Sequence, residues 1–150
     1  MGKLYEQDYY GWANEQAALL RAGNLSAADI ENIAEEIESM GKGEQRELVN
    51  RLIVLLQHLL KWELQPEKRS PRWRATIRVQ RNRIASHLVD NPSLKPVLGK
   101  AVEEAYRDAR IEASEETRLP ESRFPEVCPY RDAAILDSHF WPGGPQEFDA

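Results

Sequence analysis

The residues of this sequence best suited to chemistry are arginines at helical spacing. The segment of residues 70–84 carries five arginines and no acidic residue, in a chain of 150 residues whose net charge is −5. Arg74, Arg78 and Arg81 are four and three positions apart, so on a helix they form one line of positive charge, here called the arginine ridge. Guanidinium groups bind phosphates and carboxylates alike, so the ridge is a candidate anion site or a candidate set of ion pairs.

The partner of the arginine ridge is open between two interpretations. In the first, the ridge pairs with acidic helices of the same chain, because residues 29–47 contain seven acidic and two basic side chains and residues 103–116 are also acidic. In the second, the ridge faces solvent and binds a nucleic acid, another anion or an acidic protein. The acidity of the whole chain disfavours a long nucleic acid, because it repels a polyanion beyond the local patch.

A third hypothesis assigns a reaction to the same segment. Arg81 and Asn82 are followed, after four intervening residues, by His87, which matches in form the Arg-polar-x4-His pattern of the all-helical HEPN ribonucleases. In such a site the histidine moves protons and the arginine stabilises charge on the phosphate, with no metal. His87 lies six residues from Arg81, about 120° away around a helix, so the two converge only at a groove or a dimer interface.

The sequence predicts no metal site and no cofactor. Glu-x-x-His pairs, which hold the metals of di-iron bundles, are absent, and Gly-rich phosphate loops and Cys-His arrangements are absent as well. Glu44, Glu47, Arg51 and His58 share a flank of one predicted helix, where His58 is expected to be a satisfied core or rim histidine. Cys128 is the single cysteine and is expected to be a packed residue beside a turn.

Composition limits the class of protein. With 41% hydrophobic and 30% charged residues, the chain has the make-up of a globular domain, and no apolar run is long enough to span a membrane. The first residues lack the apolar core of a signal peptide, so a cytoplasmic protein without membrane contact is expected.

Apolar periodicity and helix-ending residues predict the elements that position these side chains. Helices are expected at residues 9–22 after a cap at Asp8, at 30–40 after a cap at Ser26, at 43–64, at 71–89 after Ser70, from Ser93 to about 117, and at 131–136. Gly23 and Gly41 are expected to end the first two helices.

The helix over residues 43–64 is expected to lie at the centre of the fold, because its apolar residues cover two adjoining faces. The helix over 71–89 should turn Trp73, Ile77 and Ile84 to the core, with the arginine ridge at the edge of that face. The predicted fold is an all-α antiparallel bundle of four to five helices with an irregular, proline-rich C-terminal segment. A single domain is expected over residues 1–142, followed by a frayed tail at 143–150.

Several segments together resemble a bacterial family catalogued as domain of unknown function 29. They are YEQDYYGWANEQAALLRAG, IENIAEEIESMGKGEQRELVNRLIVLLQHLLKW, WRATIRVQRNRI, DNPSLKP, EEAYRDARIEASEETRLP, FPEVCPY and FWP. The resemblance covers nearly the whole chain and implies a small, helical, cytoplasmic bacterial protein. It implies no activity, cofactor or catalytic residue.

The function expected from these observations is a non-enzymatic bundle that acts through protein contacts, either with a partner or with a second copy. Trp62, Trp73 and the two-faced central helix offer more apolar surface than a minimal bundle needs, which is compatible with a homodimer. Nucleic-acid binding by the arginine ridge and metal-independent ribonuclease activity at Arg81, Asn82 and His87 are the alternatives.

Overall fold

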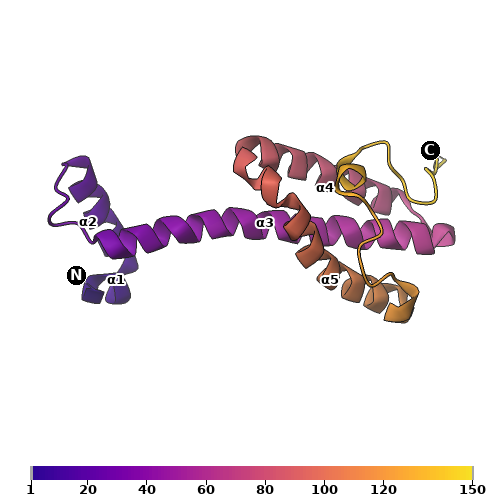
Figure 1. The fold of residues 1–150 in the computed structure, drawn as a ribbon, viewed down its shortest axis with the longest axis horizontal. Coiled ribbons are helices and arrows are strands. Elements are labelled where there is room, and N and C mark those ends of the chain that lie inside the picture. The colour runs from indigo at the N-terminus through magenta and orange to yellow at the C-terminus, as the bar shows by residue number, and fades with distance from the viewer. Residues whose placement is uncertain (1, 150) are drawn as a thin grey trace. The chain divides into compact units, whose positions relative to one another are not determined.

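The computed structural model of the chain describes residues 2–149, with side chains from residue 4 onward, and confirms an all-α fold (Figure 1). No strand occurs among these residues. The α-helices are α1 (Gly2–Gln7), α2 (Tyr9–Arg21), α3 (Ile30–Leu64), α4 (Pro71–Asp90), α5 (Leu98–Thr117) and α6 (Asp132–Leu136). Short 3-10 helices lie at Pro66–Lys68, Pro92–Val97 and Glu121–Arg123. None of the helices in this described part of the chain is long and apolar enough to cross a membrane.

The described residues divide into two compact units, residues 1–43 and residues 44–150, and α3 contributes to both. Each unit is described by itself below. The expectation of one domain over residues 1–142 stays a prediction.

The N-terminal unit contains α1, α2 and the first turns of α3, and polar contacts to buried groups hold it together. The Asp8 side chain caps α2 as predicted, and Gly23 adopts a φ of 73° just after this helix. Trp12 Nε1 donates to Asp29 Oδ2 at 2.9 Å, and the backbone N–H of Asp29 donates to Gln16 Oε1 at 2.7 Å. These bonds tie α2 to the residue that precedes α3.

The predicted break at Gly41 is wrong, because α3 runs without interruption through 35 residues. Gly41 and Gly43 lie inside the helix, and a glycine can end a helix only by leaving helical φ and ψ. The predicted cap at Ser26 is also wrong. Ser26 Oγ bonds Asn24 Oδ1, and Asp29 is the residue directly before the helix.

The C-terminal unit contains the apolar core, and α3 supplies most of it, as the width of its apolar arc predicts. Leucines at 48, 52, 55, 56 and 59 of α3 are fully buried together with Trp62. From α4, Ile77 and Ile84 are fully buried as predicted, and Trp73 is half-buried against them. Alanines on one side of α5, such as Ala105 and Ala109, are buried in the same cluster and allow close packing.

The connections differ in detail from the prediction. Ser70 caps α4 as expected, with its Oγ accepting from the backbone N–H of Trp73. Ser93 does not cap α5, because residues Pro92–Val97 form a 3-10 helix and α5 starts only at Leu98.

The segment after α6 lies against Trp62 and the arginines of α4. Trp62 Nε1 donates to the carbonyl of Gly144 at 2.9 Å, and the rings of Trp141 and Phe148 pack on Trp62. Residues 143–149 therefore have defined contacts. Fraying of this tail concerns its motion and stays a prediction.

Candidate functional site

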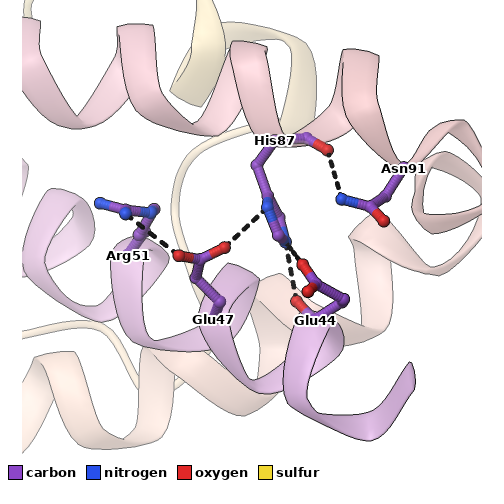
Figure 2. A network of polar contacts seen from close by, with 5 residues as sticks. All are labelled: Glu44, Glu47, Arg51, His87 and Asn91. Carbon is purple, nitrogen blue, oxygen red and sulfur yellow. Dashed lines mark hydrogen bonds and ion pairs between the residues drawn. The ribbon is translucent and has the colours of Figure 1, made fainter. Parts of the chain in front are cut away.

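A buried histidine between two glutamates forms a network of polar contacts in the C-terminal unit (Figure 2). The His87 side chain is 8% exposed. Its Nδ1 lies 2.7 Å from Glu47 Oε2, and its Nε2 lies 2.8 Å from the backbone carbonyl of Glu44 and 3.6 Å from Glu44 Oε2. Both ring nitrogens therefore face oxygen acceptors.

Two helices position these groups. Glu44 and Glu47 are three residues apart on α3 and so share one face of it, and His87 reaches them from the last turn of α4. Arg51, one turn beyond Glu47, donates to Glu47 Oε1 at 3.2 Å and leaves Oε2 directed at His87. Asn91 Nδ2 donates to the His87 carbonyl at 3.1 Å and closes the end of α4.

A hollow of about 350 Å³ opens beside His87. Its lining is mainly polar and comes from both helices: Glu47, Arg51, Asn82, Arg83, Ser86, His87 and Asp90. A small hydrated ion or a polar group could reach the site through it.

Glu44, Glu47 and His87 offer one ligand atom each, and these three atoms lie within 4.8 Å of one another. Two carboxylates and an imidazole are a ligand set that divalent transition metals accept. The sequence showed Glu44 and Glu47 on one flank, but it grouped them with His58 of the same helix. The third residue of this group, His87, lies on α4, 40 residues after Glu47. No spacing rule within one helix could have identified it.

The arginine ridge is not one continuous surface. Arg81 is 4% exposed, and its guanidinium donates to the carbonyls of Ile135, Ala134 and Phe140 at 2.8, 3.5 and 2.8 Å. Burial lowers the pKa of Arg81, and the charge of Asp137 opposes that shift. A surface role for Arg81 is therefore wrong, because its Nε and Nη2 donate inside the fold and its Nη1 is buried, without a hydrogen-bond partner among the described residues.

The other two ridge arginines are more accessible. Arg78 is exposed, and Arg74 is half-buried with its guanidinium 5.5 Å from the centre of the Phe148 ring. Both line a hollow of about 260 Å³ with Ser138 and Trp141. Among side chains 44–149, no ion pair joins a ridge arginine to a carboxylate. Pairing of Arg74 and Arg78 with acidic side chains and anion binding at these two residues both stay predictions.

The residues of the ribonuclease hypothesis do not meet in one site. Arg81 contacts the segment after α6, whereas His87 contacts α3. Asn82 lines the hollow beside His87 without Arg81. Within one chain, His87 as the proton carrier and Arg81 as the group that stabilises phosphate charge therefore do not form one site.

His58 and Cys128 have ordinary structural environments. The Nδ1 of His58 lies 2.7 Å from the carbonyl of Val54, and burial lowers the pKa of this imidazole. Burial raises the pKa of the Cys128 thiol, which makes it a poor nucleophile at neutral pH. Both agree with the roles expected from the sequence.

The N-terminal unit has an apolar surface that the sequence did not predict. The apolar positions of residues 30–40 follow the helical period, a pattern that is typical of the core-facing side of a surface helix. Instead Ile30, Ile37 and Met40 are 53%, 62% and 71% exposed, and Ala34 between them is also exposed. We call these four residues the apolar stripe of α3.

Comparison with protein families gives one match. The family model described as "Domain of unknown function DUF29" matches residues 4–141, nearly the whole chain. The chain belongs to this family. No curated protein and no solved structure matched the sequence. Membership confirms the resemblance stated above and brings no activity with it.

Proposed function

We propose that this family member is a non-enzymatic protein-binding module, and that its N-terminal unit binds a partner protein that offers a basic amphipathic helix. The proposal keeps the cytoplasmic location and bacterial origin expected from the sequence. The observation that carries it is the apolar stripe of α3, which presents Ile30, Ala34, Ile37 and Met40 on consecutive turns of one helix.

The spacing of the stripe suits a helical partner. Positions 30, 34, 37 and 40 repeat every three or four residues, which is the pattern that an amphipathic helix or groove presents to another helix. Ala34 and Gly41 are small, so a partner helix can approach the backbone of α3 between the larger side chains. Large apolar side chains exposed in a row are also uncommon on surfaces that bind nothing.

Charge decides the kind of partner. Residues 1–43 contain eight acidic and three basic side chains, a net charge of −5, whereas residues 44–150 contain 17 of each. The acidic side chains Glu31, Glu35 and Glu38 are exposed on the same turns as the stripe. A second copy would bring a further −5 to this surface, and like charges across an interface are unfavourable, so a basic partner fits better than a second copy.

Binding of model peptides tests this proposal. The probes are an amphipathic helical peptide of leucine and lysine, its leucine and glutamate counterpart, and a scrambled peptide with the composition of the first. We expect the leucine-lysine helix to bind with a stoichiometry of one, Ile37→Asp to weaken binding at least about tenfold, and salt to weaken it further. Val89→Asp is the matched control, since Val89 is 74% exposed on α4 in the other unit.

Two results would overturn the proposal. Equal binding of the scrambled peptide would show that charge alone acts and that the stripe has no role. A stable dimer in light scattering that Ile37→Asp dissociates would assign the stripe to a second copy.

A further inference from the structure

We propose that Glu44, Glu47 and His87 bind a divalent transition-metal ion, with the ion held between α3 and α4. The site lies entirely in residues 44–150, so it is independent of the partner-binding surface of the N-terminal unit. The hydrogen bonds of His87, the types of the ligands and the hollow beside the ring support this site.

The contacts of the His87 ring determine which of its two nitrogens carries a hydrogen. The Glu44 carbonyl has only lone pairs to offer, so Nε2, at 2.8 Å from it, carries a hydrogen. A neutral imidazole then has its lone pair on Nδ1. That lone pair faces Glu47 Oε2 at 2.7 Å, and an ionised carboxylate offers only lone pairs as well. A cation must therefore bridge Nδ1 and Oε2: a proton at the present 2.7 Å, or a metal ion after the Glu47 carboxylate has rotated to the wider spacing of metal ligands.

Neighbouring groups fix the orientation of the His87 ring and of the Glu47 carboxylate. Histidines that bind metals generally donate their other ring N–H to a backbone carbonyl or a carboxylate, which fixes the tautomer and the ring orientation. The Nε2 contact with the Glu44 carbonyl has this form. Arg51 holds the far oxygen of Glu47, so the near oxygen keeps its direction toward Nδ1 (Figure 2).

The two exposed glutamates and the hollow beside His87 give an ion further ligands and a way into the site. Glu44 Oε2 lies 3.6 Å from Nε2, so the Glu44 carboxylate has to rotate toward the Nδ1 side of the ring to reach an ion held there. The Glu44 and Glu47 side chains are 51% and 44% exposed, which leaves both carboxylates free to rotate while the buried imidazole stays in place. Ligand atoms around a tetrahedral ion lie roughly 3.4 Å apart for bonds of about 2.1 Å, which the present spacing allows after such a rotation. The hollow, with Ser86 and Asp90 on its wall, leaves room for water ligands.

The ligand types and the nearby arginines determine which ion the site favours and how tightly the site binds it. One nitrogen and two oxygens favour Zn²⁺, Co²⁺ or Mn²⁺ over Ca²⁺, which prefers six or more oxygen ligands. Arg51 and Arg83 line the same hollow and add positive charge near the ion, which reduces affinity. The site is therefore suited to a single, exchangeable ion.

The experiment titrates Zn²⁺ by calorimetry, and Co²⁺ by its visible absorption, into chelator-treated full-length protein. We expect one ion per chain and weakening of at least about tenfold in Glu44→Gln and in His87→Gln. His139→Gln is the matched control, because His139 is an exposed histidine that contacts only Asp137 among the described ion pairs. Nitrogen-15 NMR should show that Zn²⁺ shifts Nδ1 of His87 while Nε2 keeps its proton.

Because His87 is buried, His87→Gln could fail to fold, which circular dichroism would show. Glu44→Gln then decides the question, since the carboxylate that it changes is half exposed and outside the apolar core. Absence of saturable binding to the wild type would assign the cation between Nδ1 and Oε2 to a proton and overturn the proposal. Binding of equal strength in the wild type and in Glu44→Gln would place the ion elsewhere and overturn it too.

Discussion

Arg69 and Arg81 of the C-terminal unit, like Arg110, donate to main-chain carbonyls. Arg81 donates to three carbonyls of the segment around α6, and Arg69 donates to the carbonyls of Trp62 and Pro142. Each guanidinium also lies over a tryptophan ring, that of Trp62 for Arg69 and that of Trp141 for Arg81. The planar fork of arginine, with five donors, suits this use, which a lysine could not reproduce.

Removal of the Arg81 fork should release the C-terminal segment. We expect Arg81→Gln to lower the free energy of unfolding by about 3 kcal/mol, because buried carbonyls at residues 135 and 140 lose their donors. Urea unfolding followed by circular dichroism measures this change. The control is Arg78→Gln, whose exposed side chain should alter stability by less than about 0.5 kcal/mol. Equal effects of the two substitutions would contradict the inward role of Arg81.

At the scale of elements, α3 is the helix on which the other features depend. Its C-terminal half provides the core, residues 44 and 47 provide two ligands of the proposed metal site, and its first turns carry the apolar stripe. Gly41 and Gly43 lie between these regions with helical backbone. A Cβ added at either position would meet no atom within 4 Å.

Alanine substitution tests the continuity of α3. Gly41→Ala and Gly43→Ala should each raise the free energy of unfolding by about 0.5–1 kcal/mol, because alanine favours a helix interior and has space here. Gly23→Ala should lower it by about 1 kcal/mol, since its φ of 73° lies in the left-handed region, which favours glycine over alanine. Thermal unfolding of the three variants measures these differences. Destabilisation by Gly41→Ala would instead indicate a helix end at this residue.

The elements predicted from the sequence were those whose signals are local. The Ser70 and Asp8 caps, the buried faces of residues 43–64 and 71–89 and the all-α class follow from short-range periodicity and capping, and the structure confirms them. Gly41 misled the prediction because glycine is common at helix ends but also occurs inside helices. The surface role predicted for Arg81 was wrong because its partners are backbone carbonyls, which every residue has and which a sequence pattern therefore does not reveal. His87 was paired with Arg81 by spacing, whereas contact with Glu44 and Glu47 requires the tertiary fold.

At the scale of the whole molecule, charge and apolar core divide between the two units. The N-terminal unit holds the entire net charge, and every residue of the main apolar cluster, from Leu48 to Ile135, belongs to the other unit. The N-terminal unit has few buried apolar side chains, among them Trp12 and Ala28, and relies on buried hydrogen bonds. The two units should therefore differ in stability.

A fragment of residues 44–150 should fold by itself, because it retains the whole apolar cluster. Trp62, Trp73 and Trp141 all lie in this fragment, so tryptophan fluorescence and near-ultraviolet circular dichroism report on its packing. We expect the fragment to unfold cooperatively in urea. Its midpoint should equal that of the full-length Trp12→Phe variant, in which the same three tryptophans report on unfolding. A fragment with helical far-ultraviolet signal but no near-ultraviolet signal would contradict this expectation.

The carbonyl contacts of Arg69 and Arg81 also affect how the sequence can vary in evolution. Every residue type supplies the same carbonyl, so positions such as Ala134 and Pro142 can change identity, within the limits of packing, while the acceptor stays in place. The donors have no such freedom, because only an arginine at position 81 spans three acceptors. The C-terminal segment of this chain can therefore change in sequence while it keeps its position on the fold.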